Sequence, residues 1–262
     1  LLGLKEKKQV DELFDALSAD WQNNVTDPGS RLPDARFLGA WREHRNVFGY
    51  TLRAELVYQL RQCLSEGLAL RFVPAHLCVD EFQDLNACDL AVVRYLCDLG
   101  ATLYAAGDDD QSIYGFRYAR PDGIRAFGTQ YSPFANLKLT ECKRCDRAIL
   151  ELARFISAQD ARRAPKDITV DAGAGAGEVR ILNFKDQHQE AFGVASLCHK
   201  LTEKCDPGEI LILLRGDRHG CMSGPLAEAL ERLRVPYSVR ADPLEVLACP
   251  DLGNGKKQVD GR

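Results

Sequence analysis

The chain has 262 residues and a formal net charge of -4, with 45% hydrophobic and 27% charged residues. This composition is typical of a globular protein of one or two domains, and its slight acidity provides no overall positive field for nucleic acid. No apolar run approaches the ~18 residues of a membrane span, and the N-terminus lacks a secretory leader pattern, so we expect a soluble cytoplasmic protein.

The first 75 residues are predicted to be helical. Apolar residues recur at helical spacing in two stretches, Val10 to Leu17 and Leu52 to Leu64. Residues 27–34 lie between them and contain two prolines and a glycine, which is typical of turns. No catalytic pattern occurs in this helical part.

A different pattern begins at residue 76, where short apolar segments alternate with amphipathic ones. Such alternation predicts a parallel sheet covered by helices, and therefore an α/β core. The predicted strands cover residues 77–79, 102–106 and 136–139, and the predicted helices cover 86–99 and 147–156.

A glycine-rich stretch at residues 171–177 is predicted to be a flexible connector. It leads into a strand and carries no G-K-[ST], so a linker is favoured over a phosphate loop. A second βαβ pattern follows, with predicted strands at 179–182 and 210–214 and predicted helices at 189–201 and 226–233. Residues 253–262 are polar and are expected to be a disordered tail or an appended segment.

The chain contains ten cysteines. Most lie singly in apolar stretches, as Cys78, Cys97 and Cys198 do, and we expect these to be reduced, buried side chains. Cys142 and Cys145 have C-x-x-C spacing, which is half of a zinc ligand set. No second pair follows, so a zinc site is weakly supported.

Acidic residues follow two of the predicted strands. Asp80 and Glu81 come directly after the strand at 77–79, where ligands bind in open α/β sheets. In nucleotide hydrolases an aspartate at this edge holds Mg²⁺, and an adjacent carboxylate can activate the attacking water. The second strand leads into residues 107–117, which read G-D-D-D-Q-S-I-Y-G-F-R.

These segments resemble motifs of the UvrD/Rep/PcrA group of superfamily-one DNA helicases. Residues 79–84, V-D-E-F-Q-D, resemble motif II, and residues 107–117 resemble motif III. Residues 139–145, L-T-E-C-K-R-C, match motif IV, L-x-x-N-Y-R-S, only in the leucine and the arginine. The resemblance implies an incomplete RecA-like sheet of the P-loop NTPase type. It divides the chain into a helical insert at 1–75, part of a first motor domain at 76–145, part of a second at 146–252 and the tail at 253–262.

The resemblance also implies roles for individual residues. Asp80 would help to hold Mg²⁺, Glu81 would activate water, Gln111 would sense the γ-phosphate and Arg144 would act as an arginine finger. Single-stranded DNA would meet Tyr114, Phe116 and Arg117. These roles are physically consistent, because phosphoryl transfer needs positioned charge and aromatic faces stack on bases without reading their sequence.

Each assignment has a structural alternative. Phe116 could be a core aromatic residue, and Arg144 could be a surface cation. Asp109 and Asp110 are expected to shape their loop rather than to do chemistry.

The function implied by the resemblance is ATP-dependent helicase or translocase activity, with 3′–5′ direction expected from the family. Its cofactors would be ATP and Mg²⁺, and its partners single-stranded DNA and duplex junctions. The sequence contains neither G-x-x-x-x-G-K-[ST] nor the family's late T-x-H-x-x-K-G-L-E segment. We therefore expect a fragment of a helicase that is inactive alone.

Two other classes of function remain open. The first is a degenerate helicase-like protein that binds DNA or acts as a scaffold without hydrolysis. The second is a metal-dependent nuclease that uses Asp80, Glu81 and Asp108, although no lysine lies close to Asp80 in the sequence.

Overall fold

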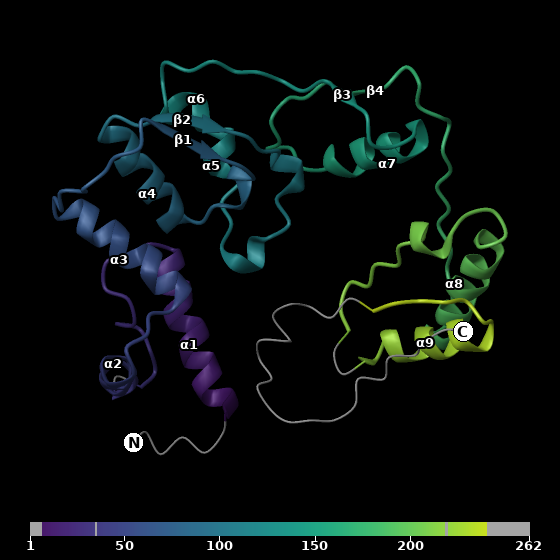
Figure 1. Ribbon diagram of the computed structural model, residues 1–262, viewed down its shortest axis with the longest axis horizontal. Helices are drawn as coiled ribbons and strands as arrows, with labels where there is room; N and C mark the ends of the chain where they lie inside the picture. Colours follow the sequence, from purple (N-terminus) through teal and green to yellow (C-terminus); the bar gives the residue numbers. More distant parts are fainter. Residues whose placement is uncertain (1–6, 35, 218–219, 240–262) are drawn as a thin grey trace. The chain divides into compact units, whose positions relative to one another are not determined.

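The computed structural model describes residues 7–34, 36–217 and 220–239. By its internal contacts the chain divides into two compact units, Leu1–Glu178 and Val179–Arg262 (Figure 1). None of the described helices is long and apolar enough to cross a lipid bilayer. The tail predicted at 253–262 lies outside the described residues, and the domain limits that the resemblance implies stay a prediction.

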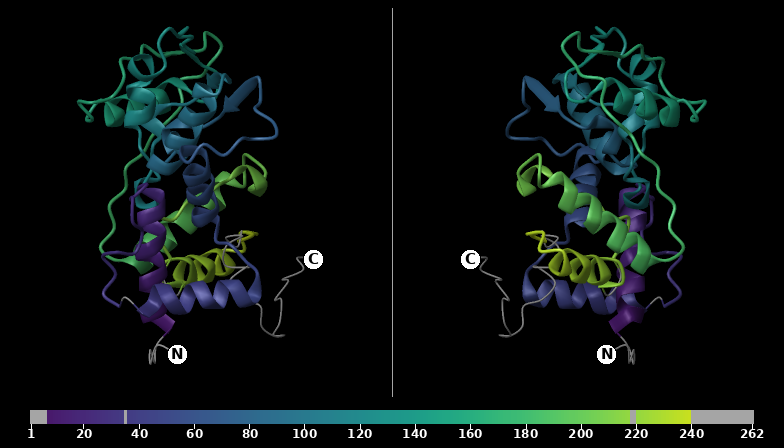
Figure 2. Two further views of the ribbon diagram at one scale, coloured as in Figure 1. Left: turned by 90° about the vertical axis from the view of Figure 1, so that its left-hand side faces the viewer. Right: turned by 90° about the vertical axis from the view of Figure 1, so that its right-hand side faces the viewer.

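The first unit begins with the predicted helical segment. Its helices are α1 (Lys7–Gln22), α2 (Arg36–Phe48) and α3 (Arg53–Ser65). Helix α1 buries Leu13, Leu17 and Trp21, which are four residues apart and therefore lie on one face. The same hydrophobic core contains Phe37, Trp41, Tyr58 and Cys88. Both views in Figure 2 place these helices toward one end of the unit and β1 and β2 toward the other.

Two strands and a helix form the part of the fold that carries the acidic motifs. Strand β1 (His76–Val79) pairs in parallel with β2 (Thr102–Ala105), and α4 (Ala87–Asp98) connects them. The side chain of Asn86 caps α4 by accepting hydrogen bonds from the backbone N–H groups of Cys88 and Asp89. The predictions of two strands and of a helix at 86–99 are confirmed to within a residue.

A second small parallel sheet follows. Strand β3 (Glu141–Cys142) pairs with β4 (Thr169–Val170), and α7 (Arg147–Ser157) lies between them in sequence and beside them in Figure 1. A short helix, η1 (Phe82–Asp84), follows β1, and the chain between the two sheets contains only short helices, η2 (Asp109–Gln111), η3 (Gly115–Arg117), α5 (Asp122–Arg125) and α6 (Phe127–Gln130). The first unit is thus a mixed α/β structure with two small parallel sheets.

The predicted helix at 147–156 is confirmed, but the predicted strand at 136–139 is wrong. A strand forms where the backbone finds a hydrogen-bonded neighbour, and the partner β4 meets the chain at residues 141 and 142. Leu137 and Leu139, which suggested the earlier position, are 94% and 95% exposed.

The second unit is built around two helices, α8 (Gln187–Leu201) and α9 (Ser223–Arg232), with the short η4 (Pro207–Glu209) between them. Both predicted helices are confirmed. Their contact buries Ala191, Ala195 and Cys198 of α8 against Leu226 and Leu230 of α9. The small side chains on α8 allow the two helices to approach closely.

The strands predicted at 179–182 and 210–214 are wrong. In the part of the second unit that the structure describes, neither segment is paired with a neighbouring strand. Ile181 and Leu213 are 88% and 81% exposed. An apolar run of this length is compatible with a strand, but only a backbone partner makes one.

The cysteines among the described residues are all free thiols. Cys198 is buried and Cys97 half-buried, but Cys78 is exposed, so its predicted burial is wrong. Successive side chains of a strand point to opposite faces, and those of His76 and Cys78 are on the uncovered face of β1.

Candidate functional site

Asp80 and Glu81 lie where the sequence predicts them, directly beyond the carboxyl end of β1. Both side chains are exposed. An oxygen of Asp80 accepts a hydrogen bond from the backbone N–H of Glu81 at 2.9 Å. The backbone of Glu81 has φ 51° and ψ 45°, in the left-handed region, which costs a residue with a side chain about 1–2 kcal/mol. Strain of this kind is concentrated at functional sites.

The buried amide of Gln83 connects the two acidic motifs. Its side chain is 1% exposed. Its nitrogen donates to Glu81 Oε2 at 2.8 Å, and its oxygen accepts from the backbone N–H of Asp108 at 3.0 Å. Gln83 therefore holds the carboxylate of Glu81 at a fixed position relative to the start of the second motif.

The two acidic motifs lie so close together at residue 107 that only glycine, which has no side chain, fits there without displacing a neighbour. A Cβ atom at this position would lie 2.5 Å from Gln83 Oε1 and 2.8 Å from a methyl carbon of Ile124. The backbone is further fixed by a hydrogen bond from the N–H of Phe82 to the carbonyl of Ala106 at 2.9 Å. No side chain can be inserted here without displacing Gln83.

Asp108 orients Gln111, the predicted phosphate sensor. Asp108 Oδ2 accepts a hydrogen bond from Gln111 Nε2 at 2.9 Å, and Oδ1 accepts one from the backbone N–H of Asp110 at 3.1 Å. Lys166 also donates to Oδ1. The carboxylate thus fixes the short helix η2 and the side chain at its end.

An ion-pair cluster holds the rest of this loop. Lys166 Nζ bonds to the carboxylates of Asp108 and Asp109 and lies 3.1 Å from that of Asp110. These carboxylates offer oxygens within 4.8 Å of one another, which is a spacing that a metal ion could also bridge. The ammonium group of Lys166 supplies one positive charge among the three carboxylates.

Two arginines complete the cluster. Arg163 makes a two-pronged contact with Asp110 at 3.0 and 2.6 Å, and Arg125 Nε donates to Asp109 at 2.8 Å. Burial raises the pKa of Asp109, but hydrogen bonds from Lys166, the backbone and Arg125 outweigh burial, so the net change is a lowered pKa. For Asp110, the hydrogen bonds from Arg163 are the main cause of a lowered pKa.

The same cluster bears on the nuclease alternative. A lysine, Lys166, does lie beside Asp108, although it is 58 residues away in sequence. It is engaged with three carboxylates rather than with Asp80, and burial, which would lower its pKa, is outweighed by those carboxylates, which raise it. This lysine is therefore held in its charged form as part of the loop's structure.

A cavity of about 500 Å³ adjoins both motifs. It is lined by Glu81, Gln83, Asp84, Gln111, Ile113, Tyr114 and Arg117. The cavity is therefore lined by residues with both predicted roles. Glu81 and Gln111 were predicted to act on the nucleotide, and Tyr114 and Arg117 to contact DNA. Asp80, Phe116 and Arg144 are not among the lining residues.

Asp84 adds a polar group that the sequence did not single out. Its Oδ1 atom is buried and has no hydrogen-bond partner among the described residues. Burial, and then the nearby charge of Glu81, raise the pKa of Asp84. A raised pKa makes this carboxyl group easier to protonate than an ordinary aspartate, and the protonated form of a carboxyl group can donate a hydrogen bond.

Aromatic and cationic side chains extend from the cavity. The rings of Tyr114 and Phe116 are 5.8 Å apart, and the guanidinium of Arg117 lies 5.9 Å from the ring centre of Tyr114. Phe116 is 76% exposed, so it is not a core residue. The exposed face of this ring is available for stacking.

Arg144 lies in the turn between β3 and α7, and its side chain is exposed. It is flanked by Cys142 and Cys145, whose sulfur atoms are 3.5 Å apart. Arg144 is not among the residues that line the cavity beside Glu81, and its role as an arginine finger stays a prediction.

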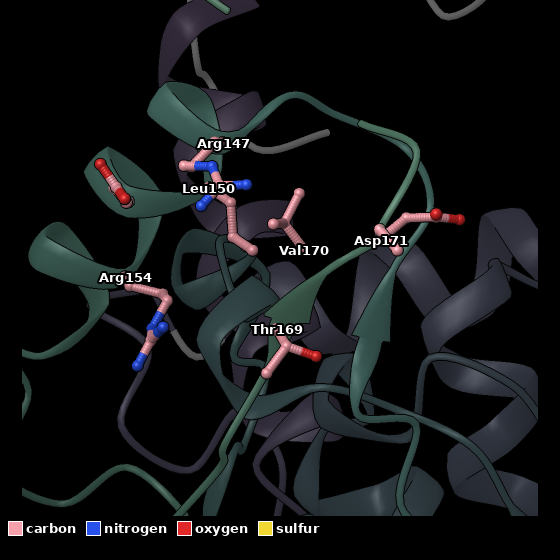
Figure 3. A pocket seen from close by; sticks show the side chains of 8 residues that line it. Arg147, Leu150, Arg154, Thr169, Val170 and Asp171 are labelled. Atoms are coloured by element: carbon pink, nitrogen blue, oxygen red, sulfur yellow. The ribbon is translucent and has the colours of Figure 1, made fainter. Parts of the chain in front are cut away.

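A second cavity, of about 390 Å³, lies between α7 and β4 (Figure 3). Arg147, Leu150 and Arg154 contribute from the helix, and Thr169, Val170 and Asp171 from the strand and its end. Leu150 and Val170 point toward one another in Figure 3. Acidic and basic groups both border this cavity, so its charge favours no particular ligand.

Several residues of the site were not identified from the sequence, among them Gln83, Asp84, Lys166 and the two arginines of the ion-pair cluster. Gln83 and Asp84 lie in the motif V-D-E-F-Q-D, but the motif implies no role for either residue. Glutamine is usually exposed, so the burial of Gln83 could not be predicted from its residue type. Lys166 lies in an unremarkable segment. No pattern at a separation of 58 residues links it to Asp108.

Comparison with known proteins agrees with the motifs. Residues 54–132 match the family described as the UvrD/REP helicase N-terminal domain. ATP-dependent DNA helicase Rep of Escherichia coli is 30% identical over 166 residues, which cover 63% of this chain and 24% of Rep. ATP-dependent DNA helicase UvrD1 of Mycobacterium tuberculosis is 32% identical over 173 residues, which cover 63% of this chain and 22% of UvrD1.

A longer match extends over most of the chain. Putative ATP-dependent DNA helicase YjcD of Bacillus subtilis is 29% identical over 253 residues, covering 90% of this chain and 32% of YjcD. The chain thus spans about a quarter to a third of the length of these relatives. The matches support the assignment of this chain to the UvrD-type helicases.

Proposed function

We propose that the protein containing this chain is an ATP-dependent DNA helicase or translocase that moves 3′–5′ along single-stranded DNA toward duplex junctions. The relatives named above are ATP-dependent DNA helicases by description, and this supports the proposal. The isolated chain is proposed to be inactive, because its sequence has no G-x-x-x-x-G-K-[ST] loop to hold phosphates.

The observation that carries the proposal is the composition of the cavity beside the two acidic motifs. Glu81 and Gln111 line it together with Tyr114 and Arg117. A motor has to link nucleotide hydrolysis to a change in its grip on DNA. A short loop that carries Gln111 at one end and an exposed aromatic pair at the other is suited to this link.

The donor set fits Mg²⁺, which prefers carboxylate oxygen atoms. Asp80 would hold the ion, with Glu81 beside it, at the edge of the sheet where both side chains are exposed. The aspartates at 108–110 are less suited, because they already form ion pairs with Lys166, Arg125 and Arg163. When bound, Mg²⁺ would neutralise charge on the nucleotide phosphates.

The chain's own residues would then act in order. The carboxylate of Glu81, held by Gln83, would accept a proton from the attacking water. Gln111, oriented by Asp108, would contact the transferred phosphate. Arg144 would supply positive charge to the transition state.

Tyr114, Phe116 and Arg117 would stack on and hold the strand.

The test uses the whole natural protein and the variant Glu81→Gln, which keeps the shape of the side chain but removes the base. We expect DNA-stimulated ATP turnover to fall about 10²- to 10⁴-fold while single-strand affinity is retained. Glu66→Gln, at another exposed glutamate, is the matched control and should behave as the unmodified protein.

Two results would contradict the proposal. If Glu81→Gln hydrolyses ATP normally, Glu81 is not the base. If the unmodified whole protein binds single-stranded DNA but shows no DNA-stimulated turnover, the protein is a non-hydrolytic DNA-binding relative instead.

A further inference from the structure

The two cysteines on either side of Arg144 form a close pair. Cys142 is the last residue of β3, and Cys145 lies in the turn that precedes α7. Their sulfur atoms are 3.5 Å apart, and both side chains are free, half-buried thiols. A disulfide bond is about 2.05 Å long, so a small rotation of the side chains would bring the sulfurs into bonding distance.

The pKa values of the two thiols are shifted in opposite directions. The backbone N–H groups of Cys145 and Arg144, and then the contact with the Cys145 side chain, lower the pKa of Cys142. The positive charge of Arg144 acts in the same direction. The pKa of Cys145 is raised, chiefly by its side-chain contact with Cys142. Cys142 is therefore the better nucleophile.

We propose that Cys142 and Cys145 form a reversible oxidation site, in which Cys142 reacts first with a peroxide and Cys145 then closes an intramolecular disulfide. The proposal rests on the paired sulfurs, on the backbone groups that surround one of them and on the access that an exposed turn provides. It does not depend on helicase activity.

The chemistry proceeds in two balanced steps. The thiolate of Cys142 attacks one oxygen of hydrogen peroxide, a sulfur–oxygen bond forms, the oxygen–oxygen bond breaks and hydroxide leaves. The hydroxide takes the proton of Cys145 to give water. The thiolate of Cys145 then attacks the oxidised sulfur, forming the disulfide and expelling hydroxide. The two sulfurs lose two electrons in total, and peroxide gains them. Thiol–disulfide exchange with a small dithiol reverses the reaction.

The other described cysteines differ in ways that predict selectivity. Burial raises the pKa of Cys88 to about 11 and also raises that of Cys198. Cys221 is exposed and provides a simple comparison thiol. Reactivity toward peroxide follows thiolate character together with access, and among these residues Cys142 has a lowered pKa and a partly accessible side chain.

Closure of the disulfide would have a structural effect on Arg144. The bond would join residues 142 and 145 into a small ring that contains Arg144, and would restrict the backbone of the turn. Any effect on ATP turnover rests on the proposed function of Arg144. The oxidation site itself is tested without it.

The test is peptide mapping of the purified 262-residue chain. The reduced protein is treated briefly with hydrogen peroxide, remaining thiols are blocked with N-ethylmaleimide, and the protein is digested with trypsin. Trypsin cuts after Lys143 and Arg144, so a disulfide appears as two linked peptides, 139–143 and 145–147. We expect this linked pair to form about tenfold faster than Cys221 is oxidised, and to disappear on reduction.

Variants separate the two roles. Cys145→Ser should stop the reaction at the sulfenic acid of Cys142, which dimedone traps, whereas Cys142→Ser should yield neither product. Cys221→Ser, the matched control, should leave the linked pair unchanged. The proposal is overturned if Cys142 and Cys221 oxidise at equal rates, or if the disulfide joins Cys142 to a cysteine other than Cys145. Because no step measures ATP turnover, failure of the proposed function would leave this result intact.

Discussion

The side-chain oxygen of Gln83 accepts a hydrogen bond from the backbone N–H of Asp108 at 3.0 Å, and this bond joins the two acidic motifs. The same amide donates to Glu81 at 2.8 Å. Since Gln83 is buried, removing it leaves a backbone donor without a partner, and such a loss costs about 1–3 kcal/mol.

Gln83→Ala is therefore expected to lower the free energy of unfolding of this chain by about 1–3 kcal/mol, measured by urea denaturation. Gln9→Ala, at an exposed position of α1, is the control and should change it by less than about 0.5 kcal/mol. Equal midpoints for the two variants would show that the amide contributes nothing to holding the motifs together.

Lys166→Met should leave the carboxylates at 108–110 close together without their shared cation. Loss of one partner of a buried ion pair typically costs on the order of 3 kcal/mol, so we expect a clear loss of stability at pH 7. Lys138→Met, at an exposed lysine in the same unit, should have little effect. Similar denaturation midpoints for both variants would contradict the prediction.

The same cluster predicts how stability depends on pH. The pKa values of Asp109 and Asp110 are lowered in the folded protein, so their contribution is present above the unfolded value of about 3.9 and is lost as pH falls through the folded values. The difference in stability between the unmodified chain and Lys166→Met should thus be largest near neutral pH and shrink below about pH 4. A difference that grows on acidification would rule this account out.

Tyr118 has a backbone φ of 60°, in the left-handed region that glycine adopts without strain. Tyr118→Gly should relieve this strain, whereas Tyr118→Ala removes the ring and retains it. We expect the glycine variant to be about 1 kcal/mol more stable than the alanine variant in urea denaturation. The prediction fails if alanine is tolerated as well as glycine.

Phe116→Ala in the whole protein should weaken single-stranded DNA binding about tenfold or more, because stacking contributes ~1–3 kcal/mol per base. Phe116→Trp keeps an aromatic face and should restore binding. Phe72→Ala is a closely matched control, since Phe72 is 77% exposed and Phe116 76%. A titration at fixed salt in which both alanine variants bind equally well would remove Phe116 from the DNA site.

Arg144→Ala in the whole protein is expected to reduce ATP turnover by about 10³- to 10⁵-fold, with a much smaller change in nucleotide affinity, because an arginine finger acts in the transition state. Lys143→Ala removes the neighbouring cation and serves as the control. Normal steady-state turnover in Arg144→Ala would make Arg144 an ordinary surface residue.

The sequence predicted the parts of the fold that are specified locally. Helices α1, α3, α4, α7, α8 and α9 follow their apolar spacing, and the two strands that precede the acidic motifs follow their short apolar runs. Asp80 and Glu81 could therefore be placed at the edge of a sheet from the sequence. Ile181 and Leu213 belong to similar runs that form no strand, because strand formation depends on a partner that the run itself does not specify.

The supporting residues of the site were beyond the reach of the sequence for a related reason. Lys166 reaches the aspartates through tertiary structure, and the bond between Gln83 and Asp108 depends on parallel pairing of β1 with β2. The residues of a sequence motif identify chemical groups that can act in catalysis or binding. They do not identify the side chains that hold those groups in position.

The ion-pair cluster also has a consequence for the order of folding. Its contacts with residues 163–166 join positions that are 53 to 58 apart, such as Ala164 with Asp109 and Lys166 with Asp108. Closing so long a segment costs chain entropy before any contact stabilises it, whereas the helices can form from neighbouring residues. The loop that carries Gln111 should therefore be completed late, after the helices and the pairing of β1 with β2. In a partly folded chain, the carboxylates at 108–110 would then lie close together before Arg163 and Lys166 contact them and compensate their charge.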